Sequence, residues 1–220
     1  MKLGVLGTGI VGQTLAGKLV SLEHEVMMGS RTVGNEKAVE WAQQAGDRGQ
    51  EGNFADAAAF GEMVINATAG GASLEALEAA GADNLSGKVL IDVANPLDFS
   101  KGMPPTLTVC NTDSLGEQIQ EAYPEVKVVK ALNTVNAGLM VAPGSIEESH
   151  SVFVCGNDDD AKAQVRELLT SFGWPTDDIL DLGDITAARG MEMYLPLWLS
   201  LARVTSSWMV NVKVVKPKER

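Results

Sequence analysis

The chain opens with Met1-Lys2-Leu3-Gly4-Val5-Leu6 and continues with Gly7-Thr8-Gly9-Ile10-Val11-Gly12. The first six residues form an apolar run typical of a buried strand, and a helical pattern follows over residues 11–22. A strand, a glycine turn and a helix in this order predict the phosphate-binding unit of a dinucleotide fold. In that unit Gly7 permits the tight turn, Gly9 admits the pyrophosphate and Gly12 lets the helix pack closely on the strand.

Short apolar runs alternate with helical patterns along the rest of the chain. We expect further strands at 25–29, 63–68, 89–93, 127–132, 151–155 and 179–182, and the clearest helix at 159–172. This alternation predicts an α/β protein with a Rossmann, doubly wound and mostly parallel sheet. The loop at 95–111 is the longest stretch without a periodic signal, and we expect it to form a wall of the active site.

From residue 184 the sequence becomes a helical pattern rich in Met, Leu and Trp. We therefore divide the chain into a dinucleotide-binding Rossmann domain at 1–183 and a small helical C-terminal extension at 184–220. The extension is expected to close the active-site cleft. Docking onto the sheet or pairing with a second copy would bury its apolar surface, and we expect a homodimer.

Composition narrows the possible partners. A formal net charge of -12 argues against nucleic-acid binding, because neutralising phosphates needs a basic surface. The most apolar stretch, 194–202, is too short to span a bilayer, so we expect a cytoplasmic protein without a membrane segment. Cys110 and Cys155 form no metal or redox pattern and are expected to be reduced core thiols, and no metal site is predicted.

The second predicted strand is followed by Ser30, Arg31 and Thr32. An NAD enzyme places a carboxylate here to bind the ribose 2′-hydroxyl, whereas this sequence offers hydrogen-bond donors. The three residues therefore predict binding of the 2′-phosphate of NADP(H). One charge-assisted hydrogen bond of about 1.5 to 3 kcal/mol corresponds to a roughly ten- to hundred-fold preference for NADP over NAD. Lys37 is expected to add to this charge, although an ordinary place in a first helical turn also explains it.

Small and polar residues follow three later strands, where a doubly wound sheet binds its ligand. Asn133 and Thr134 follow the strand at 127–132 and are candidates for aligning the hydride transfer, although a helix-capping role explains them equally. The expected contacts to the nicotinamide half of the cofactor are Thr68, Ala69, Asn95, Pro96 and Asn133.

No catalytic acid is assigned. The two histidines, His24 and His150, lie away from the carboxyl ends of the strands, and no lysine or tyrosine is convincingly placed as a proton donor. Reducing a ketone or an imine usually needs an acid, whereas passing a hydride between two bound rings mainly needs alignment. The missing acid therefore favours transfer between two redox rings.

Several blocks together resemble a known family. They are residues 7–12, Gly29-Ser30-Arg31, Asp92-Val93-Ala94-Asn95-Pro96, Val128-Val129-Lys130-Ala131-Leu132-Asn133-Thr134 and the closing pattern at 183–197. These blocks are similar to the NADPH-dependent reductases of coenzyme F420, a deazaflavin, and to the soluble oxidoreductase domain of the STEAP ferric reductases. The resemblance implies a cytoplasmic oxidoreductase that passes a hydride between NADPH and a bound F420, FMN or FAD.

Two other interpretations stay open. The chain could instead reduce a small imine or carbonyl substrate with NADPH, using Thr134 or Lys101 with water as the acid. It could also be an NADP-sensing module without turnover.

Overall fold

The computed structural model describes residues 1–217 of the 220-residue chain. Its strands are β1 (Lys2–Leu6), β2 (Glu25–Ser30), β3 (Gly49–Asn53), β4 (Met63–Asn66), β5 (Val89–Asp92), β6 (Leu97–Asp98), β7 (Thr106–Leu107), β8 (Lys127–Ala131), β9 (Val152–Gly156) and β10 (Ile179–Asp181). Its α-helices are α1 (Ile10–Ser21), α2 (Glu36–Ala45), α3 (Phe54–Phe60), α4 (Ser73–Ala80), α5 (Ala82–Leu85), α6 (Leu115–Ala122), α7 (Ala137–Val141), α8 (Asp159–Phe172), α9 (Ala188–Met193) and α10 (Leu195–Thr205). Short 3₁₀ helices are η1 (Gly46–Arg48), η2 (Gly70–Ala72), η3 (Pro143–Ser145), η4 (Thr176–Asp178) and η5 (Ile185–Ala187).

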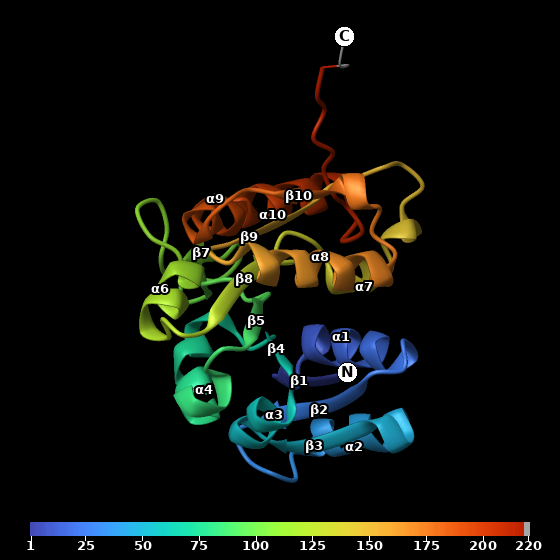
Figure 1. The fold of residues 1–220 in the computed structure, drawn as a ribbon. Helices are drawn as coiled ribbons and strands as arrows, with labels where there is room; N and C mark the ends of the chain where they lie inside the picture. Colours follow the sequence, from blue (N-terminus) through green and yellow to red (C-terminus); the bar gives the residue numbers. More distant parts are fainter. Residues whose placement is uncertain (218–220) are drawn as a thin grey trace.

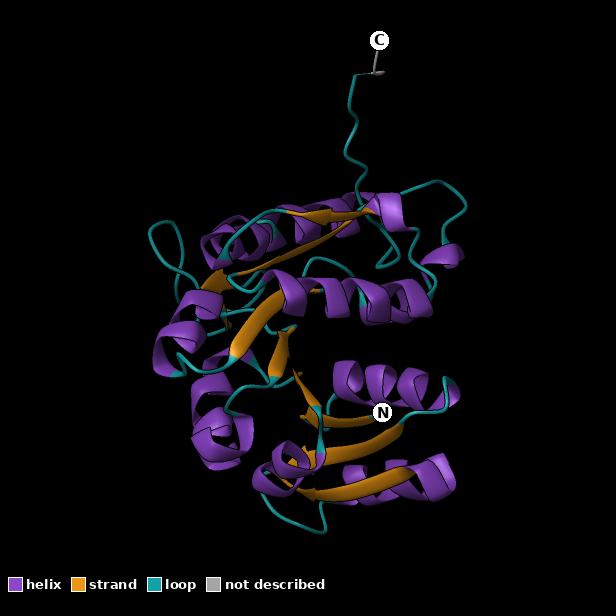
Figure 2. Ribbon diagram, in the orientation of Figure 1, coloured by secondary structure: helices purple, strands orange, loops and turns teal. Residues whose placement is uncertain are grey.

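One large sheet organises the molecule, with strands in the order β10-β9-β8-β5-β4-β1-β2-β3 (Figure 1). Neighbouring strands run parallel, except that β8 and β9 are antiparallel. Helices cover both faces of the sheet (Figure 2). The predicted Rossmann-type, doubly wound and mostly parallel α/β fold is therefore confirmed.

Each face of the sheet has its own hydrophobic core. In β5, Val89 and Ile91 face a core shared with α1, α2, α7 and α8, whereas Leu90 faces a core shared with α3, α4 and α6. Val129 and Val128 of β8 divide between the two cores in the same way. Successive side chains of a strand point to opposite faces, so strands buried on both sides appear as continuous apolar runs in the sequence.

Three details of the sheet region were not expected from the sequence. The edge strand β3 pairs with β2, yet its sequence Gly49-Gln50-Glu51-Gly52-Asn53 holds no large apolar residue. Its conformation therefore comes from pairing rather than from hydrophobic pattern. The direction of β9 is reversed, with Val154 opposite Ala131 of β8. The loop at 95–111 contains the small antiparallel hairpin of β6 and β7.

The C-terminal extension is not one continuous helix. It consists of η5, α9 and α10, followed by an irregular tail as far as residue 217. Pro196 explains the break between α9 and α10, because it has no N–H to donate to the carbonyl of Glu192 one turn earlier. Ile185, Ala188 and Met191 complete the core beneath α6. Within residues 1–217, no helix has both the length and the apolar character needed to cross a bilayer.

The two cysteines lie in different surroundings. Cys155 is buried in β9 as expected, and burial raises the pKa of its thiol to about 12. Cys110 is exposed, so the expectation of a second core thiol is wrong. Cys110 lies in the largely polar segment Thr108-Val109-Cys110-Asn111-Thr112-Asp113, in which only Val109 packs against a core.

Candidate functional site

The three glycines of the first turn have different structural roles. Gly7 has a φ of 118°, in the left-handed region, and a Cβ there would lie 2.6 Å from the carbonyl oxygen of Ala67. A Cβ at Gly12 would lie 2.1 Å from the carbonyl oxygen of Gly7. A Cβ at Gly9 would meet no atom within 4 Å. The fold therefore requires glycine at positions 7 and 12, whereas Gly9 faces open space.

That open space lies in front of the N-terminus of α1. Gly9 is the N-cap residue, no side chain caps the helix, and the first turn carries no acidic residue. The first N–H groups of a helix have no partner within the helix and form its positive end. An anionic group in front of Gly9 would satisfy both features, so the turn fits a pyrophosphate.

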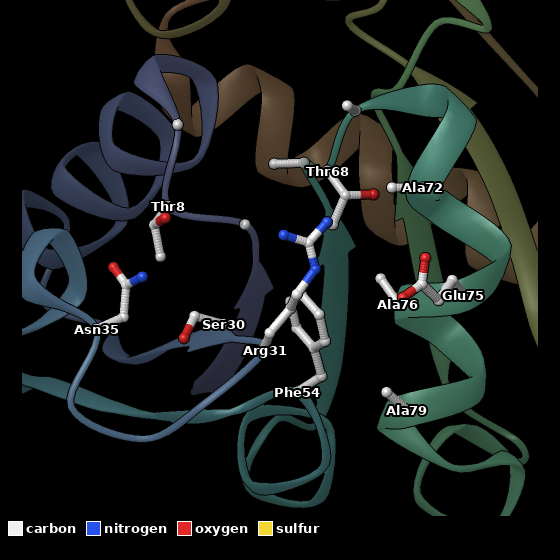
Figure 3. Close-up of a pocket in the computed structure, with 14 residues that line it drawn as sticks. Thr8, Ser30, Arg31, Asn35, Phe54, Thr68, Ala72, Glu75, Ala76 and Ala79 are labelled. Carbon is white, nitrogen blue, oxygen red and sulfur yellow. The ribbon is translucent and has the colours of Figure 1, made fainter.

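A groove of about 460 Å³ continues from this turn, and we call it the glycine groove (Figure 3). It runs between the glycine turn, the end of β2, the start of α3 and one side of α4. Its lining residues are Gly7, Thr8, Gly9, Ser30, Arg31, Asn35, Phe54, Ala67, Thr68, Ala69, Ala72, Glu75, Ala76 and Ala79.

Arg31 is the basic side chain of the groove. It follows β2 directly, is exposed, and extends its guanidinium across the groove (Figure 3). It forms no ion pair with any residue in the range 1–217. The neighbouring Ser30 hydroxyl donates to the carbonyl of Thr32 at 2.6 Å, which shapes the turn that presents Arg31. An unpaired guanidinium at this position fits an anionic ribose substituent.

One wall of the groove was not anticipated from the sequence. Phe54 begins α3, Ala72 ends η2 directly before α4, and Ala76 and Ala79 present small side chains along α4. Glu75, also on α4, is the acidic residue of the lining. An alanine-rich helix has no chemical signature, so only the fold reveals that these residues leave room for a flat ring beside Arg31.

The carboxyl ends of β5 and β8 are joined by a pair of amides. Asn133 Nδ2 donates to Asn95 Oδ1 at 3.0 Å, and Asn95 Nδ2 donates to the main-chain oxygen of Asn133 at 2.9 Å. Asn133 Nδ2 also donates to the carbonyl of Met191 in α9, at 3.1 Å. The C-terminal extension is thus attached to the strand ends at the carboxyl edge of the sheet.

The residues around this pair show features common at binding sites. Leu132 is buried and has a φ of 62°, a left-handed conformation that is costly for a branched side chain. Asn133 Oδ1 and Thr134 Oγ1 are buried and have no hydrogen-bond partner in the described part of the chain. A buried polar atom without a partner is costly. A ligand carrying an amide group would supply the missing hydrogen bonds.

A buried polar network connects the glycine groove with the C-terminal extension. Thr68 Oγ1, on the groove wall, donates to Asn66 Oδ1 at 2.6 Å, and Asn66 Nδ2 donates to Asp92 Oδ1 at 2.9 Å. Asp92 Oδ2 lies 2.8 Å from Lys130 Nζ, which also lies 2.8 Å from Glu192 Oε1. Burial alone would lower the pKa of Lys130, but the two carboxylates outweigh burial and raise it.

The predicted cofactor residues fall into four groups. Gly7, Thr8, Gly9, Ser30, Arg31, Thr68 and Ala69 line the glycine groove together. Ile10, Val11 and Gly12 form the first turn of α1, and Asn95, Pro96 and Asn133 lie at the ends of β5 and β8. Thr32 and Lys37 are exposed and lie outside the groove lining. For each of these residues, direct contact with a cofactor stays a prediction.

Comparisons with known proteins agree with this geometry. The family model described as NADP oxidoreductase, coenzyme F420-dependent, matches residues 2–96. The F420-dependent NADP reductase of Methanocaldococcus jannaschii is 31% identical over 213 residues, which cover 91% of this chain and 92% of that protein. Together with the Rossmann fold and the glycine groove, these matches define the chain as an NADP-dependent oxidoreductase. It belongs to the family of F420-dependent NADP oxidoreductases.

Two further relatives support the same placement. A crystal structure from Arthrobacter sp. fb24, provisionally assigned as an f420 dependent nadp-reductase, is 53% identical and has a TM-score of 0.92, with 98% of this chain and 100% of that chain covered. The metalloreductase STEAP3 of Rattus norvegicus is 30% identical over 213 residues, which are 95% of this chain but 38% of the rat protein. The chain thus spans less than half the length of that metalloreductase.

Proposed function

We propose that the chain transfers a hydride between NADP(H) bound along the glycine groove and a second redox ring, a deazaflavin such as coenzyme F420 or a flavin. The observation that carries the cofactor half of the proposal is the unpaired Arg31 guanidinium beside an uncapped helix N-terminus. In this arrangement the first turn of α1 holds the pyrophosphate and Arg31 binds the 2′-phosphate.

The nicotinamide half is expected at the carboxyl ends of β4, β5 and β8, because ligands of doubly wound sheets lie outside these ends. NADPH supplies a hydride there when it is bound. The unpartnered Asn133 Oδ1 and Thr134 Oγ1 would bind the carboxamide and fix the plane of the ring. Fixing that plane aligns the donor and acceptor atoms, which is the main requirement for a transfer between two rings.

The choice of a deazaflavin as second ring rests on family membership, and on relatives described as F420-dependent. In this proposal α9 closes one side of the cleft, since Asn133 binds its Met191 carbonyl directly. The hydride passes from one bound ring to the other, and solvent supplies the proton that completes the reduced acceptor, so no acidic side chain of the protein is required.

We also propose that two copies of the chain associate through α10. This helix is apolar on more than one side. Its side chains Leu195, Trp198 and Ala202 are buried against the rest of the protein. On another side, Leu197, Leu201 and Val204 follow one another at helical spacing. We call the latter three residues the outer stripe. Leu197 is 55% exposed and Val204 is 78% exposed. Leaving an apolar stripe of a helix in contact with water is unfavourable, so a stripe of this kind indicates a contact surface. The segment 194–210 holds one charged residue, Arg203, so two acidic copies would meet where repulsion is weakest.

The direct test is NADPH oxidation by the purified protein with coenzyme F420, FMN, FAD or no added acceptor, and with NADH as control. Rapid NADPH consumption with one ring cofactor, together with slow NADH consumption, is the expected result. Binding of NADPH without reduction of any of these acceptors would reject the two-ring reaction.

A further inference from the structure

Three charged side chains, Asp92, Lys130 and Glu192, lie together in the interior, and we call them the buried triad. None of the three is more than 1% exposed. Lys130 Nζ lies 2.8 Å from a carboxylate oxygen of each partner and donates to the carbonyl of Ala94 at 2.6 Å. Two carboxylates share one ammonium group, so the triad carries a formal net charge of -1 without contact with water.

Both carboxylates of the triad are surrounded by hydrogen-bond donors. Asp92 accepts from the Asn66 side chain, from the N–H of Ala94 and from Lys130. Glu192 accepts from Lys130 and from two main-chain N–H groups at the start of α6, at 2.9 and 3.1 Å. Within the described residues, every partner of these four oxygens is a donor, and a protonated carboxyl group would need an acceptor.

Neighbouring groups do not cancel the excess charge. The N-terminus of α6 offsets part of the charge of Glu192, but a helix end is equivalent to only about half a unit charge. Cys155 pairs with Lys130 across the sheet, and burial raises the pKa of its thiol to about 12, so it stays neutral. The nearby Glu117 and Arg189 form a matched pair with no net charge.

The triad lies at the carboxyl edge of the sheet. The carbonyl that Lys130 binds belongs to Ala94, the residue directly before Asn95, and Asn133 follows Lys130 by three positions. Asn95 and Asn133 form the amide pair at the end of β5 and β8. Under the proposed function this edge holds the nicotinamide ring, which is positively charged when oxidised and neutral when reduced.

We infer that the buried triad makes the protein bind NADP⁺ in preference to NADPH, and that Glu192 supplies the charge responsible. The inference rests on the proposed position of the nicotinamide ring. Glu192 is not a catalytic residue, because it acts on the ring through its charge and not through contact. If the ring lies about 12 Å from this charge, Coulomb's law at an effective dielectric of about 20 to 40 gives a roughly three- to tenfold change in the binding ratio. The same bias shifts the bound nucleotide pair towards its oxidised form.

The test measures dissociation constants for NADP⁺ and NADPH by titration calorimetry. Wild-type protein is expected to bind NADP⁺ at least as tightly as NADPH. Glu192→Gln is expected to shift the ratio of the two constants towards NADPH by roughly three- to tenfold. The matched control is Glu117→Gln, which also removes one negative charge and one carboxylate that joins α6 to α9. Glu117 and its partner Arg189 are partly exposed, so solvent screens this change of charge. In this control variant, the ratio of the dissociation constants for NADP⁺ and NADPH is expected to change by less than about twofold.

A purely structural role for Glu192 would weaken the binding of both nucleotides equally and leave the ratio unchanged, which would overturn the inference. Glu192→Asp keeps the charge and should keep the wild-type ratio even if the protein becomes less stable. If Glu192→Gln does not fold, Asp92→Asn neutralises the other carboxylate of the triad and should shift the ratio in the same direction. Tighter binding of NADPH than of NADP⁺ by the wild-type protein would reject the inference without any variant. Failure of both nucleotides to bind would instead reject the proposed function.

Discussion

Asn133 Nδ2 donates to Asn95 Oδ1 at 3.0 Å while Asn95 Nδ2 donates back to the main chain of residue 133 at 2.9 Å, so each asparagine holds the other. Asn95→Ala would leave both the buried amide and the main-chain oxygen of Asn133 short of a partner. We expect the free energy of unfolding to fall by about 1 to 3 kcal/mol, measured by urea denaturation. Asn84→Ala removes a single hydrogen bond, from the side chain to the carbonyl of Ala80, and serves as control. Equal losses for the two variants would contradict a special role for the pair.

Arg31 is expected to decide between the two nicotinamide cofactors. In Arg31→Ala the dissociation constant for NADPH should rise roughly ten- to hundred-fold, because a charge-assisted hydrogen bond to the 2′-phosphate is lost, while that for NADH should change little. Fluorescence titration measures both. Lys37→Ala is the control on the exposed first turn of α2, outside the groove lining, and should change NADPH affinity less. A parallel loss of NADH affinity in Arg31→Ala would refute the assignment.

Gly9 and Gly12 should respond differently to the same added methyl group. Because a Cβ at Gly9 meets no protein atom within 4 Å, Gly9→Ala is expected to keep the wild-type melting temperature and lose at least about tenfold in NADPH affinity. Gly12→Ala places its Cβ 2.1 Å from the Gly7 carbonyl and should lower the melting temperature. Thermal denaturation and a binding titration on the same samples separate the effects. A Gly9→Ala protein that binds NADPH normally would show that the pyrophosphate lies elsewhere.

Asp178 links the stability of the C-terminal tail to pH. Burial opposes its ionisation, but the ion pair with Lys213 and the hydrogen bonds from Ser149 outweigh burial and lower the pKa of Asp178. A lowered carboxyl pKa stabilises the folded protein above the unfolded value near 3.9, and this contribution disappears as the pH falls through the folded value. Asp178→Asn should therefore cost about 1 kcal/mol at pH 7 and progressively less as the pH falls below the unfolded value, measured by urea denaturation. Asp177 is an exposed neighbour, so Asp177→Asn should cost little stability at neutral or at acidic pH. If Asp178→Asn loses the same stability at neutral and at acidic pH, this linkage is excluded.

The outer stripe makes the oligomeric state testable. Leu197→Glu would place a charge within the proposed contact, and we expect it to convert a dimer into a monomer in size-exclusion chromatography with light scattering. Val33→Glu is a matched control, because Val33 is 62% exposed but lies beside α2 at the far side of the sheet. A wild-type monomer, or a Leu197→Glu dimer, would show that another surface or none mediates association.

Much of the fold could be predicted because the central strands are buried on both faces. Val89-Leu90-Ile91 can be recognised without a structure, since each side chain enters a core. The edge strand β3 could not, because Gly49-Gln50-Glu51-Gly52-Asn53 shows neither an apolar run nor alternation. The reversal of β9 was equally hidden, because strand direction depends on the path of the connection and leaves no mark in the strand's own residues.

The site was predictable where its residues directly follow strands. The glycine turn, Arg31 and Thr68 could be assigned from the sequence for this reason, whereas Phe54 and Glu75 reach the groove from helices. One signal of the buried triad was visible: Lys130 interrupts an apolar strand, and a buried ammonium group needs a carboxylate partner. Its partner Glu192 lies 62 positions later along the chain, and only tertiary packing identifies it.

The reversed direction of β9 determines where the end of the described chain lies. Because β9 runs against β8, its first residues stand at the edge where the parallel strands finish. The main-chain oxygen of Ser151 accepts a hydrogen bond from the side chain of Asn211, and its N–H donates to the carbonyl of Val212, so the tail lies at the carboxyl edge of the sheet, whereas Met1 lies at the opposite edge. Under the proposed function the carboxyl edge holds the nicotinamide ring. A fluorescent label is therefore better attached at Met1 than at the tail, because it then lies on the side of the sheet away from the proposed cofactor.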